Sequence, residues 1–260
     1  MQRLVLALVA IVLASQQARA QEPAHPCATF ERDTIEGVTE RGDLVLAQGG
    51  PTAMAGLRLP DEPPLRDRAL ASLRRRVGGA VAIEKTYGTD RWNRVLAVLL
   101  VGEGGTCAPL ASDLVRSGLA VWDPGPHGIV LPGLRGHEEA ARKRSLGLWA
   151  EDRYKAIPVR QVDRLRERVG RFVLVEGRVL SVGERRLRTY LNFGSDWTRD
   201  FTLIVPSRVW REMTARGVTA AALKGRRIRA RGVLEEWQGP ALAVTVPEAI
   251  EVLGNERQRH

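Results

Sequence analysis

Residues 38–61 read VTERGDLVLAQGGPTAMAGLRLPD, and this stretch decides the fold of the first half of the chain. Residues 38–46 predict a strand, a bend at Arg41-Gly42-Asp43 and a second strand, because apolar residues flank a pair of turn-forming residues. Gln48-Gly49-Gly50-Pro51 predicts another turn, and residues 52–59 predict a third strand. Three short strands joined by glycine-containing turns are typical of a small β-barrel.

The segments that follow complete this pattern and then repeat it. An amphipathic helix is expected over residues 65–77, and Gly78-Gly79 ends it. Apolar strands are expected over 80–86 and 94–101, with helices over 110–117 and 134–145 and a short strand over 119–122 between them. The second half predicts strands over 171–182, 187–192 and 200–205, a helix over 207–222, and strands over 226–234, 241–246 and 250–253. The predicted fold class is therefore α+β, mainly β with helices, built as two tandem OB-type five-stranded barrels.

Four segments of the first half resemble staphylococcal-nuclease-type domains. Residues 38–61 resemble V-x-D-G-D-T-x-x-L followed by R-L-x-G-I-D-x-P-E, and residues 90–97 resemble D-x-Y-G-R-x-L-A. Residues 114–120 resemble L-V-x-x-G-L-A, and residues 138–149 resemble E-x-x-A-R-x-x-x-x-G-L-W. Together these segments cover about residues 36–150, in the family's order. The resemblance implies a barrel of the nuclease type as the first domain.

The resemblance also implies a chemistry, calcium-assisted phosphodiester hydrolysis with two carboxylate ligands, a carboxylate base and two arginines. The two metal carboxylates fall on Gly42 and Arg58, which cannot bind a cation. The base falls on Asp61, and the second arginine is retained as Arg94. The first arginine falls on Ala53, and a tyrosine of the motif falls on Trp92.

Two interpretations of this degraded motif stay open. In the first, the domain is inactive and needs no cofactor, and Arg58 with Arg94 binds an anion; alternatively, Arg58 forms a surface ion pair with Asp61 or Glu40. In the second, the protein is an active phosphodiesterase with calcium in a rearranged site around Glu40, Asp43, Asp61 and Arg94.

The second predicted barrel carries arginines interleaved with aromatic residues, a mixture that binds single-stranded nucleic acid on OB barrels. The candidate binding residues are Arg186, Arg188, Tyr190, Asn192, Trp197, Arg199 and Trp237. Alternating arginines, such as Arg227, Arg229 and Arg231, can equally form the solvated face of a strand. On the helix expected over residues 134–145, Glu138 and Arg142 have the spacing of an i,i+4 ion pair.

The chain carries a net charge of +10, which suits an anionic partner such as nucleic acid, another polyanion or an envelope protein with acidic groups. A structural envelope adaptor without a polyanion site is a further alternative. His127 and His137 stand alone, which disfavours a histidine metal site. Cys27 and Cys107 are expected to form a disulfide in an exported protein.

The opening residues have the layout of a secretory signal that ends at Ala18-Arg19-Ala20, so a periplasmic or secreted location is expected. No later segment reaches the length of a membrane span. The expected organisation is a signal peptide (1–20), a leader (21–36), the nuclease-like domain (37–152), a linker (153–165), the second barrel (166–254) and a tail (255–260).

Overall fold

Five strands of the first half of the chain close into a barrel, with the order β2-β3-β4-β7-β6 and a return to β2. This computed structural model describes residues 25–102, 106–196 and 198–254. All neighbouring strands of the barrel are antiparallel except β4 and β7, which are parallel. Its strands are β2 (Glu31–Val38), β3 (Leu44–Leu46), β4 (Gly50–Met54), β6 (Ala80–Thr89) and β7 (Val95–Val101).

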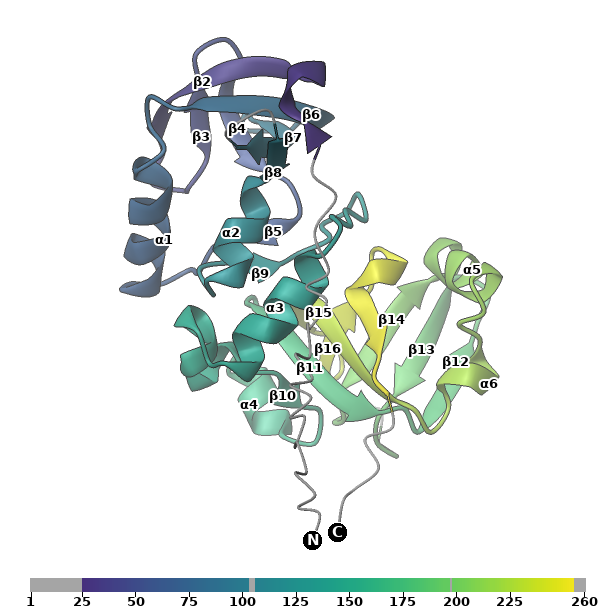
Figure 1. Cartoon of the computed structure of the whole chain (residues 1–260). Coiled ribbons are helices and arrows are strands. Elements are labelled where there is room, and N and C mark those ends of the chain that lie inside the picture. The colour runs from purple at the N-terminus through teal and green to yellow at the C-terminus, as the bar shows by residue number, and fades with distance from the viewer. Residues whose placement is uncertain (1–24, 103–105, 197, 255–260) are drawn as a thin grey trace, which may run out of the picture.

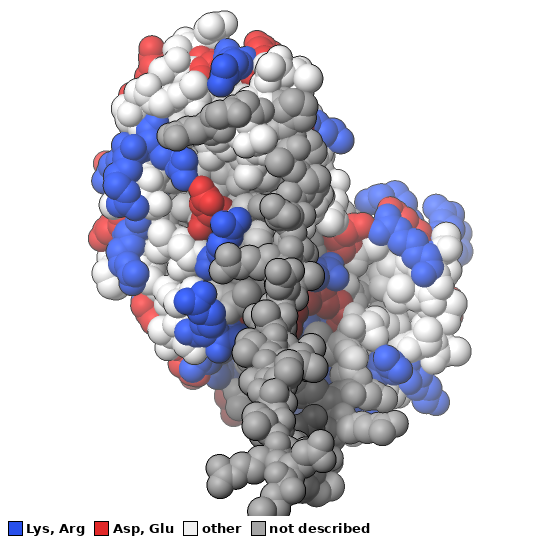
Figure 2. Space-filling view, in the orientation of Figure 1, with Lys and Arg blue, Asp and Glu red and all other residues white. Residues whose placement is uncertain are grey.

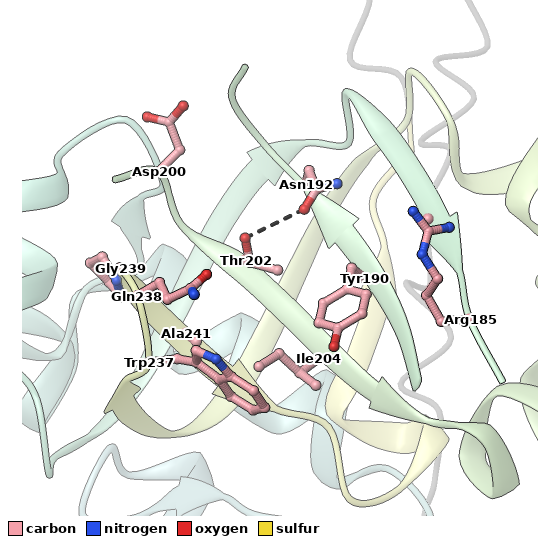
Figure 3. A pocket seen from close by; sticks show the side chains of 12 residues that line it. Arg185, Tyr190, Asn192, Asp200, Thr202, Ile204, Trp237, Gln238, Gly239 and Ala241 are labelled. Carbon is pink, nitrogen blue, oxygen red and sulfur yellow. Dashed lines mark hydrogen bonds between the residues drawn. The ribbon is translucent and has the colours of Figure 1, made fainter. Parts of the chain in front are cut away.

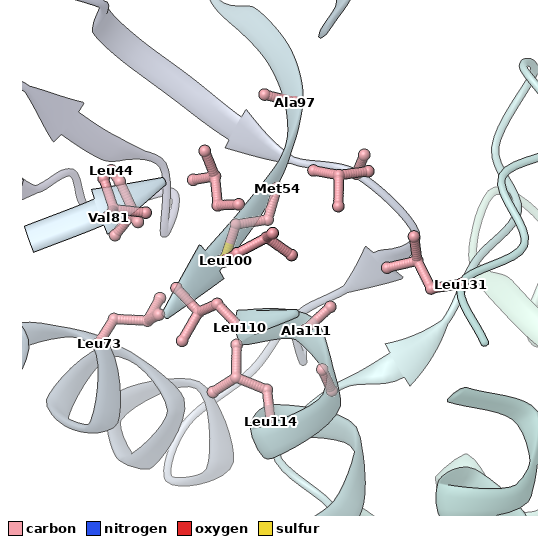
Figure 4. Packing of buried hydrophobic residues seen from close by; sticks show 14 of the residues in the cluster. Leu44, Met54, Leu73, Val81, Ala97, Leu100, Leu110, Ala111, Leu114 and Leu131 are labelled. Atoms are coloured by element: carbon pink, nitrogen blue, oxygen red, sulfur yellow. The ribbon is translucent and has the colours of Figure 1, made fainter. Parts of the chain in front are cut away.

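Helices and short strands pack around this barrel (Figure 1). They are β1 (His25–Pro26), η1 (Cys27–Thr29), β5 (Leu57–Arg58), α1 (Leu65–Arg74), β8 (Thr106–Pro109), α2 (Leu110–Arg116), β9 (Val121–Trp122), α3 (Leu134–Lys143), η2 (Gly147–Ala150) and η3 (Asp152–Tyr154). The apolar stripe of α1, which includes Leu73, meets Leu100 of β7 and Leu114 of α2 in one buried core (Figure 4). Burial of such side chains is what holds α1 on the barrel.

The second half of the chain forms another sheet with its own buried core. Its elements are β10 (Ile157–Pro158), α4 (Val162–Arg166), β11 (Phe172–Arg178), β12 (Ser181–Glu184), β13 (Arg188–Asn192), β14 (Thr202–Pro206), α5 (Ser207–Ala215), α6 (Ala220–Leu223), β15 (Arg227–Glu236), β16 (Pro240–Ala243), η4 (Pro247–Ala249) and β17 (Ile250–Val252). The strand order β11-β15-β16-β14-β13-β12 contains one parallel pair, β14 with β16. Because β12 follows β11 after two residues, this order is compatible with the second OB-type barrel expected from the sequence.

Two of the expected boundaries are wrong. Residues 21–36 are not a leader throughout, because β2 begins at Glu31 and pairs with β6. Residues 153–165 are not a free linker, because β10 pairs in parallel with β11 and buries Ile157 in the core of the second domain. In both places the segment is held by pairing with a strand that comes later in the sequence.

Two expected elements are each divided at a glycine with positive φ. The strand over 52–59 is interrupted at Gly56 (φ 82°), after which β5 leaves the barrel and pairs with β9. The helix over 207–222 is interrupted at Gly217 (φ 82°), which separates α5 from α6. A left-handed backbone at these positions ends regular structure, and glycine adopts it with little strain.

A disulfide joins Cys27 of η1 to Cys107 of β8, as expected, with the two Cα atoms 5.2 Å apart. β1 pairs with β8 beside it, so the start of the described chain is fastened to the outer edge of the first domain's sheet. The expected signal peptide and tail lie outside the described residues. Within the described ranges, no helix is long and apolar enough to cross a membrane.

A cluster of buried charges joins the two domains, and we call it the interdomain ion cluster. Arg231 of β15 is 2% exposed and donates to Glu138 of α3 at 2.8 Å and to Glu251 of β17 at 2.5 Å. Arg229, two residues earlier on β15, pairs with both Glu251 and Glu176. The expectation of a solvated arginine face is therefore wrong for Arg231, because this face of β15 is covered by α3 of the first domain.

Trp122 lies at the centre of this contact. Its backbone N–H donates to Glu138 at 3.0 Å, and its carbonyl accepts a hydrogen bond from Arg231 at 2.6 Å. The guanidinium of Arg231 also lies 4.3 Å from the centroid of the Trp122 ring. The expected local pair of Glu138 with Arg142 is wrong, since Glu138 binds Arg231 and Arg142 lies 3.6 Å from Glu176.

Apolar residues of both domains surround these charges. Leu65, Val121 and Trp149 of the first domain share a buried cluster with Leu174 of the second. The domains are thus joined by apolar contacts as well as by the ion cluster, and they form one continuous body (Figure 1).

We expect Arg231→Ala to destabilise the protein strongly, because it leaves Glu138 buried without its cation and removes one of the two arginines that pair with Glu251. Loss of one partner of a buried ion pair typically costs about 3–5 kcal/mol. Arg227→Ala is the matched control, since Arg227 lies on the same strand and pairs with Glu176 but has a half-exposed side chain; its cost should be about 1 kcal/mol or less. Urea denaturation measures both, and equal costs would show that the cluster contributes no more than a surface pair.

Candidate nucleic-acid interface

The hairpin between β6 and β7 is organised by one carboxylate. Asp90 accepts hydrogen bonds from the backbone N–H of Trp92 (2.9 Å) and Arg94 (3.1 Å), and from the Arg94 guanidinium at 2.6 and 2.9 Å. Asn93 takes up the positive φ (57°) that the turn requires. The Arg94 hydrogen bond holds the pKa of Asp90 below the ordinary value of an aspartate. The sequence Asp90-Arg91-Trp92-Asn93-Arg94 therefore fixes its own hairpin.

Arg94, the arginine retained from the nuclease motif, is held by a second carboxylate as well. Its Nη1 lies 2.8 and 3.0 Å from the two carboxylate oxygens of Asp43, which is buried. The hydrogen bond to Asp90, together with that to Asp43, raises the pKa of Arg94. Asp43 and Arg94, two candidates for a rearranged active site, are thus brought together, but as partners that neutralise each other.

Trp92 presents an aromatic surface next to these ion pairs. It is 49% exposed, and the guanidinium carbons of Arg91, Arg94 and Arg41 lie 4.1, 5.0 and 5.6 Å from its ring centroid. Arg41 comes from the turn between β2 and β3. Neither Arg41 nor Arg91 has an acidic partner among the described residues, so their charge is available to an anion. We call Arg41, Arg91 and Trp92 the Trp92 platform.

The remaining candidates of the first domain lie elsewhere. Arg58 pairs with Asp123 at 3.2 Å, and its guanidinium carbon lies 4.8 Å from the ring centroid of Phe172, which belongs to the second domain. Asp61 is exposed and lines a small crevice with Arg58 between the domains. Arg58 therefore pairs with neither Asp61 nor Glu40, and it shares no carboxylate with Arg94. Glu40 is exposed, and its backbone carbonyl accepts a hydrogen bond from Arg66.

The closed barrel of five strands with helices packed around it defines the first domain as an OB-type barrel of the nuclease kind. Residues 60–151 match the family model described as staphylococcal nuclease homologue, so the chain contains a staphylococcal-nuclease-like domain. No curated protein matches the chain.

The resemblance assigns the family's two metal positions to Gly42 and Arg58, and neither residue fits calcium. Gly42 has φ of 88°, and a Cβ atom there would lie 2.1 Å from Leu59 Cδ1, so backbone and packing both disfavour a carboxylate. Arg58 brings a cation to the other position, and both oxygens of Asp43 face Arg94. Among the described residues, no three histidine, cysteine, aspartate or glutamate side chains are grouped so that they could hold one metal ion.

In the second domain, the structure gathers some of the candidate residues around a groove. Tyr190, Asn192 and Trp237 line a cavity of about 410 Å³, and Arg188 lies 4.6 Å from the Trp237 ring centroid. Arg186 and Arg199 are exposed but do not line the cavity. Trp197 lies outside the described residues. The sequence analysis overlooked Arg185, Thr202 and Gln238, which also line the groove; their closeness depends on how three separate strands pair.

Asp90→Asn should make the stability of the protein depend differently on pH. A carboxylate with a lowered pKa stabilises the folded state fully above its ordinary pKa of 3.8, and this contribution is lost as the pH falls through the lowered value. We therefore expect wild type to exceed Asp90→Asn in stability at neutral pH and the two to converge in acid. Asp67→Asn, on the exposed face of α1, is the control for removal of one surface carboxylate, and it should lower the stability at neutral pH less than Asp90→Asn does.

Gly42→Ala should destabilise the first domain, because alanine is strained at φ 88° and its Cβ meets Leu59. A non-glycine residue in this region of backbone space typically costs about 1–3 kcal/mol. Gly78→Ala is the control for backbone strain alone, since Gly78 has φ of 84° and open space around it. Denaturation curves should rank Gly42→Ala as the more destabilised variant; the reverse order would show that contact with Leu59 adds nothing.

Proposed function

We propose that this is an exported nuclease-like protein that binds nucleic acid through its first domain without cutting it. The observation that carries the proposal is that, of the three arginines around Trp92, one is paired with carboxylates and two are not. Arg94, the cation that the family uses on the phosphoryl group, is held by Asp43 and Asp90, whereas Arg41 and Arg91 have no acidic partner among the described residues.

The loss of hydrolysis follows from the chemistry of the site. Each missing charge-stabilising donor typically lowers the rate about 10²–10³-fold. The positions of two metal carboxylates and one arginine carry Gly42, Arg58 and Ala53, and Arg94 would have to leave two carboxylates before it could stabilise a transition state. The combined deficit is too large for a useful phosphodiesterase.

The affinity that we expect for nucleic acid comes from the arginines and the aromatic ring of the Trp92 platform. Arginines beside an exposed aromatic ring bind single strands by pairing with phosphates and by stacking on bases. The net charge of +10 favours the approach of a polyanion. Export is supported by the signal-like pattern of residues 1–20 and by the disulfide between Cys27 and Cys107.

A cleavage assay tests the first half of the proposal. The purified, oxidised protein is incubated with single-stranded DNA, double-stranded DNA and RNA, in calcium or in chelator, and we expect no cleavage in any condition. An Asp61→Ala/Arg94→Ala variant controls for contaminating nuclease. Calcium-dependent cleavage that this variant lacks would contradict the proposal and establish an active phosphodiesterase.

A salt-titrated binding assay tests the second half. Arg41→Ala/Arg91→Ala should weaken binding of single-stranded DNA about tenfold and reduce the slope of log Kobs against log salt, since each phosphate contact contributes to that slope. Arg74→Ala/Arg75→Ala removes the same charge from α1, where basic side chains line the edge of the first domain (Figure 2). An equal loss in both variants would reduce the effect to net charge and overturn the assignment to the Trp92 platform.

A further inference from the structure

The second domain repeats the arrangement that forms the Trp92 platform. Trp237 lies in the turn of the β15–β16 hairpin, as Trp92 lies in the turn of β6–β7, and it is 50% exposed. Arg188, at the end of the β12–β13 turn, lies over the Trp237 ring, as Arg41 from the β2–β3 turn lies over Trp92. In each domain the second strand of the hairpin pairs in parallel with an earlier strand, β7 with β4 and β16 with β14.

The second domain also has a groove beside this arrangement. The cavity of about 410 Å³ lies over β13 and β14 beside the β15–β16 hairpin. The rings of Tyr190 and Trp237 flank Ile204, which lies between them (Figure 3). This volume is within the range of sites for small organic ligands, and its aromatic and aliphatic lining suits a flat ring.

Polar groups lie along the same groove. The amide of Asn192 is oriented by its neighbours, since Nδ2 donates to Ser181 and Oδ1 accepts from Thr202 (Figure 3). The Gln238 amide, on the hairpin, has no hydrogen-bond partner among the described residues, so both its donor and its acceptor can meet a ligand. A flat ring with polar edges, such as a nucleobase, matches an apolar groove with amides along it.

Exposed arginines lie in the turns next to the groove. Arg185, Arg186, Arg188 and Arg199 are exposed, and none has a carboxylate partner within the described part of the chain. The nearby carboxylates of Glu184, Asp196 and Asp200 accept hydrogen bonds from the protein itself. Glu235 and Glu236 on the hairpin oppose part of this positive charge, so binding should rest on stacking as well as on phosphate contacts.

We infer that this groove is a second nucleic-acid site, which takes bases of a single strand between Tyr190 and Trp237 while Arg185 and Arg188 pair with phosphates. A duplex cannot use it, because its bases are stacked and paired and only an unstacked base can enter. The choice of nucleic acid as the ligand rests on the proposed function. The groove itself is independent of the nuclease-like domain, so the two sites can be tested separately.

The test uses the full chain and a fluorescein-labelled oligodeoxythymidylate of about ten nucleotides, a length within the usual footprint of one such barrel. Trp237→Ala should weaken binding about tenfold, since loss of one stacked base costs about 1–3 kcal/mol. Trp237→Phe keeps an aromatic ring and should retain most of the affinity. Thermal unfolding of both variants, which should match wild type, verifies that the exposed side chain has no structural role.

Charge-matched variants and an altered background complete the design. Arg185→Ala/Arg188→Ala should weaken binding more than Arg74→Ala/Arg75→Ala on α1. In a Trp92→Ala/Arg41→Ala/Arg91→Ala background, the oligonucleotide should still bind, and Trp237→Ala should then remove most of what remains. An unlabelled duplex should fail to displace the oligonucleotide from that background.

Two results would overturn the inference. If Trp237→Ala binds like wild type while the platform variants lose affinity, the groove takes no nucleic acid and the proposed function stands. If Trp237→Ala loses affinity but a duplex displaces the oligonucleotide equally well, the hairpin contacts a backbone rather than an unstacked base. Unchanged affinity in the platform variants would contradict the proposed function, and it would leave a loss of affinity in Trp237→Ala as support for the groove.

Discussion

The ion pair between Arg231 and Glu138 is the interaction on which the arrangement of this protein depends. Neither charge could be buried alone, because the desolvation of an unpaired guanidinium or carboxylate costs several kcal/mol. Glu138 meets its cation only in the other domain, whereas Arg231 is bound both by Glu138 and by Glu251 of its own domain. The Trp122 backbone adds one hydrogen bond to each of Glu138 and Arg231. The two domains are therefore specified to meet in one register. A sliding motion that kept the apolar contacts would still leave buried charges unpaired.

The fixed arrangement of the two domains determines which residues of the nuclease-like segments are exposed. Phe172 of the second domain lies over Arg58, which already pairs with Asp123, so a residue that the resemblance assigns to a metal position lies at the contact between the domains. The Trp92 platform stays exposed on a hairpin that Asp90 fixes internally. The first domain thus has an accessible aromatic and basic surface at the Trp92 platform, whereas Arg58 lies at the contact between the domains.

The spacing of apolar residues and the composition of the sequence predicted much of the fold. The barrel strands, α1 and the disulfide follow from apolar periodicity, turn residues and a pair of cysteines, which are local or compositional signals. The role of Arg231 could not be predicted, because alternating arginines on β15 have the same pattern whether solvent or α3 covers them. Glu138 was assigned to Arg142 because four-residue spacing is visible in a sequence, whereas its actual partner lies 93 residues away. The Trp92 platform and the groove likewise depend on turns that come together only when separate strands pair, so the sequence revealed their residue types but not their neighbours.

The tight fit of Gly42 against Leu59 also bears on how this domain can evolve. A calcium site at the positions that the resemblance assigns to metal carboxylates would need a carboxylate where φ is 88° and a Cβ atom would displace Leu59, release of Asp43 from Arg94, and removal of Arg58 from Asp123. Each change made alone strains the backbone or leaves a charge unpaired, and none produces a metal site until the others are present. A calcium site could therefore be reached only through intermediates that are less stable and still lack a complete ligand set, so the packing around Gly42 acts against the stepwise acquisition of a metal.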